Sequence, residues 1–371
     1  MRIVKVVSKS HMREFVRLPK HIYENNDYWV PPLWHEENHA YYAKNNVMLQ
    51  NNEHQLFILI DDSGKTIGRI LVYIDSSFIK HTNNNIGFFG VFECIEDQRA
   101  ADLLLDTARA WLIERRIDFM RGPIHPIAES WGFLLEGYES EPVLMAPYNL
   151  PYYHDQMESF GLKKIKDLYA YEANCQTGYR IPERIERFAT TFSEKHPEIT
   201  LRPIRLKDLM QDAEHIWRIT NIALSDNWGY VPVGHAVLLD MVKRLKTLLD
   251  TDAIWFIEEF GRPVGFALGF PDPNSLIKKI DGRLFPFGFI RFLLEKSKIK
   301  RYRLISLGVL PEYHGKGLDV LLYRELNKAL ASRGIILEAN YILEDNWNIR
   351  NALEKLKLQK TKVYRIYQMP I

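Results

Sequence analysis

Residues 304–319 read LISLGVLPEYHGKGLD, and the order of residue types in this stretch predicts a strand, a tight turn and a helix. Gly315 and Gly317 allow the backbone to approach a ligand closely. The helix N-terminus behind them carries a partial positive charge, and Lys316 adds a full one. The turn is therefore predicted to bind an anion, with a plain connecting loop as the alternative for the turn taken alone.

The chain repeats one order of elements twice. DYWVP at residues 27–31 is answered by DNWGYVP at residues 226–232, and each is followed by two β-rich runs around a glycine turn. These runs and the next strand, helix and closing strand lie at 56–60, 67–73, 88–94, 100–115 and 163–171, and again at 253–257, 264–270, 304–309, 318–332 and 360–367. Five matches in register predict two copies of one α/β domain.

The repeat also sets the expected domain boundaries. Residues 1–175 and 199–371 are expected to be the two copies, and residues 176–198 a connector with a helix at 182–195. A length of 371 residues suits two domains of this size. The first 175 residues carry a net charge of −6 and the remainder +8. This asymmetry fits an anionic cofactor in the second copy, although halves of any protein can differ by several charges.

The second copy resembles the GNAT superfamily of acyl-coenzyme A-dependent N-acyltransferases. The turn is similar to the superfamily's pyrophosphate-binding motif, Q/R-x-x-G-x-G/A, with His314, Gly317 and Asp319 at the three signature positions. His314 and Asp319 depart from the motif. Residues 346–358 are similar to a second superfamily segment, N-x-x-A-x-x-x-Y-E-K-L-G-F, in which Leu353 replaces the tyrosine.

The resemblance implies two tandem GNAT-like domains, each a mixed, mostly antiparallel sheet flanked by helices. Two parallel strands near the centre of the second sheet would splay apart to admit the pantetheine arm of acetyl-coenzyme A or another acyl-coenzyme A. An amine would then attack the thioester directly. The residues that the resemblance assigns to the cofactor are Leu307, Gly308, Val309, His314, Gly315, Lys316, Gly317, Leu318, Asp319 and Asn346.

Candidate catalytic groups lie on or after the strand expected at 335–343. Glu338 and Glu344 are the candidate bases, and solvated charges at a strand end are the alternative for each. The superfamily's helix tyrosine serves as the acid. Because Leu353 occupies that place here, Tyr341 or Tyr323 is a candidate substitute, with a core aromatic as the alternative.

The first copy has no glycine turn at the matching place. Its Glu96 and Asp97 would repel a diphosphate, so this copy is predicted to be a degenerate domain with an acceptor-binding or structural role. The aromatic segment at residues 148–154 could line an acceptor pocket, and packing is the alternative. The acceptor is expected to be a small-molecule or peptide amine.

Other functional classes find little support in the sequence. No apolar run reaches the roughly 18–20 residues of a membrane span, and no signal-peptide core is present, so we expect a cytoplasmic protein. No metal-ligand spacing and no basic, aromatic stripe for nucleic acid appear. The oligomeric state stays open. Two alternatives to acetyl transfer also stay open: a catalytically inert ligand-binding sensor or partner module, and a transferase for long-chain acyl or aminoacyl groups.

Overall fold

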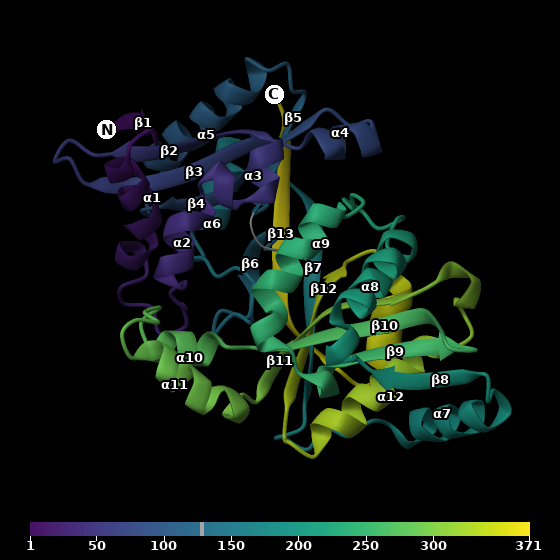
Figure 1. Ribbon diagram of the computed structural model, residues 1–371. Coiled ribbons are helices and arrows are strands. Elements are labelled where there is room, and N and C mark those ends of the chain that lie inside the picture. Colours follow the sequence, from purple (N-terminus) through teal and green to yellow (C-terminus); the bar gives the residue numbers. More distant parts are fainter. Residues whose placement is uncertain (127–129) are drawn as a thin grey trace. The chain divides into compact units, whose positions relative to one another are not determined.

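The computed structural model describes residues 1–126 and 130–371 (Figure 1). The chain divides into two compact units. Unit 1 comprises Met1–Leu168, Asn274–Lys296 and Lys362–Ile371, and unit 2 comprises Tyr169–Pro273 and Ser297–Thr361. Each unit is a mixed, mostly antiparallel sheet flanked by helices, as the sequence predicts. None of the helices in the described ranges combines the length and the apolar character that a bilayer crossing requires.

Unit 1 is built on a sheet with the strand order β1-β2-β3-β4-β5-β13, in which β4 and β5 pair in parallel. Its strands are β1 (Arg2–Lys5), β2 (Glu53–Ile60), β3 (Thr66–Ile74), β4 (Ile86–Cys94), β5 (Phe119–Gly122), β6 (Phe133–Glu136), the start of β7 (Lys163–Asn174) and the end of β13 (Gln359–Pro370). Its helices are α1 (Lys9–Ile22), α2 (Trp34–Ala40), α3 (Val47–Asn51), α4 (Ser76–Thr82), α5 (Gln98–Ile113), α6 (Tyr153–Phe160), α10 (Asn274–Lys279) and α11 (Gly288–Glu295).

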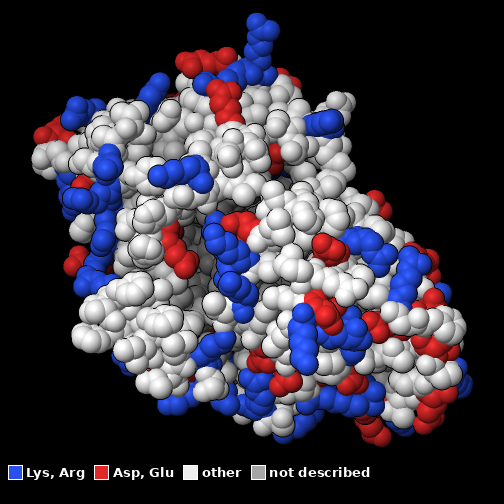
Figure 2. Space-filling view, in the orientation of Figure 1, with Lys and Arg blue, Asp and Glu red and all other residues white. Residues whose placement is uncertain are grey.

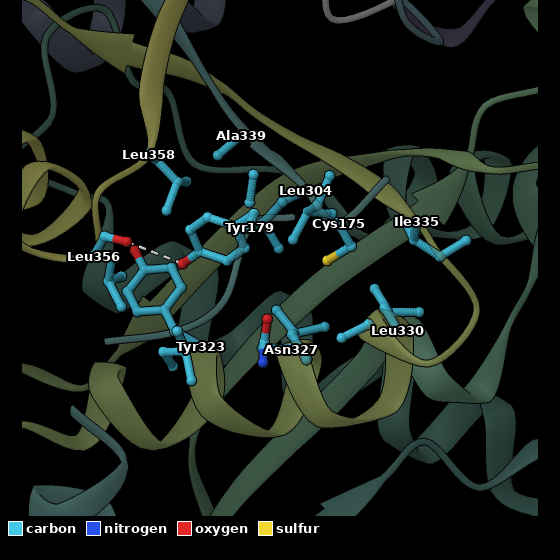
Figure 3. Close-up of a pocket in the computed structure, with 15 residues that line it drawn as sticks. Cys175, Tyr179, Leu304, Tyr323, Asn327, Leu330, Ile335, Ala339, Leu356 and Leu358 are labelled. Atoms are coloured by element: carbon cyan, nitrogen blue, oxygen red, sulfur yellow. Dashed lines mark hydrogen bonds between the residues drawn. The ribbon is translucent and has the colours of Figure 1, made fainter. Parts of the chain in front are cut away.

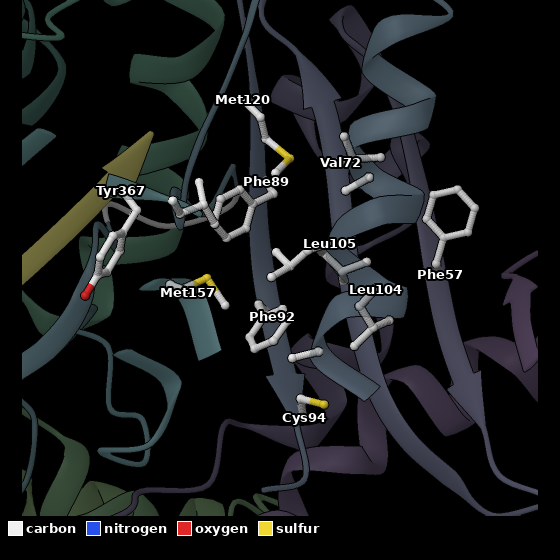
Figure 4. Packing of buried hydrophobic residues seen from close by; sticks show 14 of the residues in the cluster. Phe57, Val72, Phe89, Phe92, Cys94, Leu104, Leu105, Met120, Met157 and Tyr367 are labelled. Carbon is white, nitrogen blue, oxygen red and sulfur yellow. The ribbon is translucent and has the colours of Figure 1, made fainter. Parts of the chain in front are cut away.

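The core of unit 1 lies between α5 and the strands β2–β4. Apolar residues recur along α5 at helical spacing, so Leu104, Leu105 and Leu112 all face the sheet and are fully buried. Figure 4 shows the surrounding side chains, with Phe57 and Val72 of the strands near these leucines. Replacing Leu104 by alanine would remove contacts in this close-packed region, at a cost of roughly 2–5 kcal/mol.

Unit 2 repeats the arrangement, with the strand order β7-β12-β11-β10-β9-β8. Its own strands are β8 (Ile199–Pro203), β9 (Ile254–Glu259), β10 (Arg262–Pro271), β11 (Arg301–Val309) and β12 (Ile336–Leu343). Its helices are α7 (Glu183–Lys195), α8 (Leu209–Ala223), α9 (His235–Leu245), α12 (Leu318–Ala331) and α13 (Trp347–Lys355). The predicted helix at residues 182–195 and the glycine turn before α12 are both confirmed.

Residues 1–175 and 199–371 follow one element order: a strand, a helix, a hairpin, a strand, a long helix, a parallel strand, a short helix and a closing strand. The predicted fold class of two tandem copies is therefore confirmed. The compact units differ from the expected division at 175 and 199, because residues 274–296 and 362–371 group with unit 1. The compact units are defined by which residues pack together, whereas the two copies are defined by the repeated order of elements. The boundaries of the two copies therefore stay a proposal.

Candidate functional site

The parallel strands β11 and β12 of unit 2 pair over a short distance only. Their register runs from Arg301 opposite Ile336 to Leu304 opposite Ala339. Beyond Leu304, β11 continues along β10 as far as Val309. At Ile305 the β10–β11 register shifts by one residue, which is a β-bulge that bends the strand. The two strands are therefore paired at one end only, which agrees with the splay that the resemblance implies.

The part of β11 beyond Leu304, which pairs with β10 but no longer with β12, carries the three residues assigned to the pantetheine. Leu307 is half-buried, while Gly308 and Val309 are buried. A Cβ at Gly308 would lie 3.1 Å from the ring of Phe266 and 3.5 Å from Ala223 of α8, so a side chain here would be crowded. The hydroxyl of Ser306 is buried without a hydrogen-bond partner among the described residues. An unsatisfied donor next to a bulge is available to a ligand.

The glycine turn follows this strand and is open to solvent. Gly315 and Gly317 have φ values of +76° and +79°, and α12 begins at Leu318, which is buried. His314, Gly315 and Lys316 are exposed. A Cβ at Gly315 would meet nothing within 4 Å, so the backbone here is free to contact a ligand. The geometry suits an anion at a helix N-terminus.

Side chains around the turn are already engaged. His314 Nε2 lies 2.8 Å from the carbonyl oxygen of Val309, so this nitrogen donates to the main chain. The Nζ of Lys316 lies 4.8 Å from the centre of the Tyr313 ring. The Tyr313 hydroxyl donates to Glu259, and this hydrogen bond raises the pKa of Tyr313 to about 12. These contacts fix the loop that leads into the turn.

The connector helix α7 contacts the turn, which the sequence does not predict. A Cβ at Gly317 would lie 2.6 Å from Cζ of Phe188, a residue of α7. Gly317 is therefore required by its positive φ and by the close approach of an aromatic ring. A substitution at Gly317 would displace Phe188 as well as any ligand.

Asp319, in the first turn of α12, differs from the small residue of the superfamily motif. Burial raises the pKa of its carboxyl, against the opposing effect of the backbone N–H groups of Val320 and Asp319 itself. The carboxyl therefore lies close to backbone N–H groups at the start of α12, which are the donors that a bound diphosphate would use. Tyr323, one turn further along the helix, is buried and its pKa is raised well above the usual value.

Glu338, a candidate base, is fully buried in β12. One carboxylate oxygen accepts a hydrogen bond of 2.7 Å from Nη2 of Arg301, and the other accepts one of 2.9 Å from Nδ2 of Asn340. Asn340 in turn accepts from Nε of Arg303 at 2.6 Å. A carboxylate held this way would have to leave a buried ion pair before it could take a proton from an amine.

The remaining candidates lie further along the chain. Tyr341 and Glu344 are half-buried, and the guanidinium of Arg303 lies 5.1 Å from the centre of the Tyr341 ring. The side-chain oxygen of Asn346 caps α13 by accepting from the N–H of Ile349 at 3.2 Å. Leu353, at the place of the superfamily's tyrosine, is fully buried and offers no proton. Glu344 is therefore the more accessible of the two candidate bases.

An apolar cavity of about 40 Å³ lies between α12 and the β11–β12 face of unit 2. Figure 3 shows Tyr323, Asn327 and Leu330 reaching from α12 toward Tyr179 and Cys175. The hydroxyl of Tyr179 donates to the carbonyl oxygen of Leu356 at 3.0 Å. Burial raises the pKa of the Cys175 thiol, so it stays protonated and unreactive. A cavity this small and apolar admits a short hydrocarbon group only.

In unit 1, the two places that correspond to the glycine turn and to the splayed strands are filled by the chain itself. Asp97 caps α5, where its carboxylate accepts from the N–H groups of Arg99 and Ala100 at 2.8 and 3.3 Å. The N–H of Ile124 donates to the carbonyl oxygen of Phe89 at 2.9 Å, and a Cβ at Gly90 would lie 2.2 Å from the Ile124 oxygen. The helix N-terminus and the space beside β4 are thus occupied by the chain itself.

Unit 1 instead contains a cavity of about 310 Å³ that the sequence analysis missed. At its lining, Glu93 accepts hydrogen bonds of 2.7 Å from the hydroxyls of both Tyr23 and Tyr153. Nη2 of Arg69 lies 3.6 Å from the other carboxylate oxygen. Burial raises the pKa of Glu93, while Arg69 and the two tyrosines oppose that rise. A buried carboxylate with this many partners is typical of a binding or catalytic site.

A second polar group lines the same cavity. The hydroxyl of Tyr41 donates to Glu37, and its oxygen lies 3.5 Å from Nε2 of His125. Burial lowers the pKa of His125 to about 3, so its ring is neutral at physiological pH. Among the described lining residues, the two carboxylates Glu37 and Glu93 therefore face a single guanidinium, that of Arg69. The cavity favours a positively charged group.

The aromatic segment at 148–154 serves two purposes. Tyr148 and Asn149 line the cavity, and Tyr153 bonds to Glu93. His154 is buried and bonds to the hydroxyl of Tyr367 at 2.7 Å, which is a packing role. A sequence signal for the cavity did exist. Arg69 and Glu93 interrupt apolar strands and lie opposite each other in the β3–β4 register, where an isolated charge requires a partner.

No family model matches the chain. Protein YghO of Escherichia coli is 29% identical over 375 residues, which cover 98% of this chain and 94% of that protein. A bacterial ceramide synthase of Caulobacter vibrioides is 28% identical over 377 residues, which cover 99% of this chain and 97% of that protein.

Solved structures match the chain at much lower identity. A tandem GNAT protein from the clavulanic acid biosynthesis pathway has a TM-score of 0.56 at 9% identity, over 100% of this chain and 98% of that one. The GCN5-related glucosamine N-acetyltransferase region of a fungal multi-domain β-N-acetylglucosaminidase has a TM-score of 0.57 at 12% identity, over 99% of this chain and 38% of that one. The chain therefore has the GNAT fold in its tandem form.

Proposed function

We propose that this protein is an acyl-coenzyme A-dependent N-acyltransferase whose unit 2 holds the cofactor. One observation carries the proposal: two parallel strands pair over only four residues each and are followed by an exposed glycine turn at a helix N-terminus. The part of β11 that no longer pairs with β12 would hold the pantetheine. The turn from His314 to Leu318 would hold the pyrophosphate. Backbone N–H groups and Lys316 supply the donors and the positive charge.

In the proposed reaction, the nitrogen of a neutral amine attacks the thioester carbonyl. A carbon–nitrogen bond forms, the carbon–sulfur bond breaks, and the thiolate takes up a proton. Glu344 is proposed as the base because it is partly exposed, whereas Glu338 is buried in its ion pair. Tyr341 is proposed as the acid, and the unsatisfied hydroxyl of Ser306 as a donor to the developing oxyanion.

The acyl group and the amine are proposed to be long-chain lipids. A ceramide is a long-chain amino alcohol acylated at its nitrogen, and the relative named as a ceramide synthase matches this chain over nearly its whole length. We also propose that the cavity of unit 1 is a separate binding site for an amino alcohol. Its two carboxylates, together with its tyrosine hydroxyls, suit an amino alcohol.

The test is a substrate panel with the purified full-length protein. Acetyl-, octanoyl- and palmitoyl-coenzyme A are each offered to a sphingoid amine, to a short amino alcohol and to a peptide amine. Release of free thiol gives the rate, and mass spectrometry identifies the amide. We expect palmitoyl transfer to the sphingoid amine to be fastest. Amide formation on the peptide alone would contradict the lipid assignment, and thiol release without any amide would contradict N-acyl transfer.

Asp319 favours a second function, that of a ligand-binding module without turnover. Its carboxyl lies at the donors that a diphosphate requires, so coenzyme A would bind weakly or in an altered position. A protein of this kind would bind acyl-coenzyme A in calorimetry but form no amide with any amine in the panel.

A further inference from the structure

Residues 284–294 form an apolar surface that the rest of the described chain does not cover. Phe285, Phe287 and Leu294 are 71%, 76% and 71% exposed, and Phe289, Ile290 and Leu293 are each about half exposed. Six large apolar side chains within ten residues are far more than the scattered single exposures of an ordinary surface. We call this segment the apolar patch.

Helix α11, which carries most of the apolar patch, buries none of its residues. A helix of eight residues is marginally stable in water, and most helices gain their stability by packing an apolar face. The other long helices of unit 1, such as α1 and α5, do bury such a face. The apolar patch therefore lacks the packing partner that its composition requires.

Basic residues surround the apolar patch. Residues 278–296 contain five lysines or arginines and two acidic residues, Asp281 and Glu295. Several of these charges are paired: Glu295 lies 3.4 Å from Lys279 and 2.9 Å from Arg291, and Asp281 lies 3.0 Å from Lys20 and 3.7 Å from Arg283. Lys278 pairs with Glu141 at 2.7 Å, and the basic residues still outnumber the acids when this pair is included. In Figure 2 the surface at the place of α10 and α11, at the lower left, is largely white, with blue at its edge. An apolar surface surrounded by more basic than acidic residues is complementary to the headgroup layer of an anionic membrane.

We propose that the apolar patch inserts into the headgroup region of an anionic membrane. The exposed apolar residues of α11 share one face of the helix, and Phe285 and Phe287 of the preceding loop extend that surface beyond the helix. An amphipathic helix with basic residues beside its apolar face suits the headgroup layer of a membrane. Membrane binding by this surface is independent of the proposed acyl transfer, and it can be measured without any enzymatic turnover.

The experiment is co-sedimentation of the full-length protein with vesicles of phosphatidylcholine, with and without phosphatidylglycerol. We expect the native protein to bind the anionic vesicles and to release them as salt is raised. A variant with Phe285→Ser, Phe287→Ser and Leu294→Ser should have an apparent partition coefficient lower by about tenfold or more. Because these side chains are exposed, the variant should melt as the native protein does.

Phe260→Ser is the matched control, because Phe260 is 85% exposed but lies in the β9–β10 turn of unit 2. It should leave vesicle binding unchanged. In a separate variant, Leu294→Trp, the tryptophan emission should shift to the blue on addition of anionic vesicles. The proposal is wrong if the native protein stays in the supernatant with both vesicle types, or if the triple variant binds as well as Phe260→Ser. A dimer that the triple variant dissociates, with no vesicle binding, would identify a second copy as the partner instead.

Discussion

Arg301 and Glu338 form a 2.7 Å ion pair across β11 and β12, within the four-residue stretch over which these two strands are paired. Glu338 is fully buried and also accepts from Asn340, so this pair holds the strands together just before they separate. The first prediction concerns this pair. Glu338→Gln should lower the free energy of unfolding by about 3 kcal/mol, because it removes the nearest negative charge from the partly buried Arg301. Denaturant unfolding measures the change.

The paired replacement Arg301→Met with Glu338→Gln is the control, since it removes the charge of Arg301 as well. It should recover part of the lost stability. An unchanged unfolding midpoint in Glu338→Gln would show that the pair does not stabilise the fold.

Glu344→Gln should lower the turnover rate by roughly 10²–10⁴-fold, because it keeps the shape of the side chain and removes its basicity. Coenzyme A affinity should hardly change. Raising the pH should restore part of the rate, because more of the amine is then neutral without a base. Asp345→Asn, at the exposed neighbouring position, is the matched control in the same thiol-release assay. Full activity of Glu344→Gln at neutral pH would place the base elsewhere.

The glycine turn is best tested in a background without Phe188. Phe188→Ala removes the ring that a Cβ at Gly317 would strike, and alone it should keep coenzyme A affinity. Adding Gly317→Val to that variant then places a side chain where the backbone would meet the pyrophosphate, on a backbone with positive φ. Affinity measured by calorimetry should fall at least tenfold, or about 1.4 kcal/mol. Equal affinity in the two variants would remove the turn from the cofactor site.

Coenzyme A affinity should depend on the ionisation of Asp319. Burial raises the pKa of this carboxyl, so it becomes charged at a higher pH than an exposed aspartate does. A charged Asp319 repels the diphosphate, and affinity should therefore decline as the pH rises through the raised pKa. Asp319→Asn should bind more tightly at neutral pH and lose this decline. Coenzyme A affinity is measured for the native protein and for Asp319→Asn at the same pH values, so that the ionisation of coenzyme A itself affects both curves equally. If affinity changes with pH in the same way for both proteins, Asp319 has no role.

Glu93→Gln tests the cavity of unit 1. The amide still accepts from Tyr23 and Tyr153 but no longer attracts an ammonium group. The affinity for a sphingoid amine, measured by calorimetry without acyl-coenzyme A, should fall about tenfold or more, while acyl-coenzyme A affinity stays the same. Glu96→Gln, at an exposed position three residues on, is the control. An unchanged affinity for the amine in Glu93→Gln would assign the cavity a structural role.

Much of the fold followed from the sequence, because its signals are local. A hairpin depends on its turn, a helix on its apolar spacing, and the glycine turn on two residues at positive φ. The candidate site followed in part. The splay and the open turn agree with the expectation, but His314 is engaged by the Val309 carbonyl and Asn346 by the N-terminus of α13.

The sequence alone determined the repeated order of elements, the tandem fold and the place of the turn before α12. Only the tertiary structure decided which groups meet across long sequence distances: Glu93 with Tyr23, Phe188 with Gly317, and the C-terminal strand with β5 and β6. It also decided that the phenylalanines near α11 are exposed, although their composition predicts burial. Pairing and burial depend on which faces pack together, and no local pattern encodes that choice.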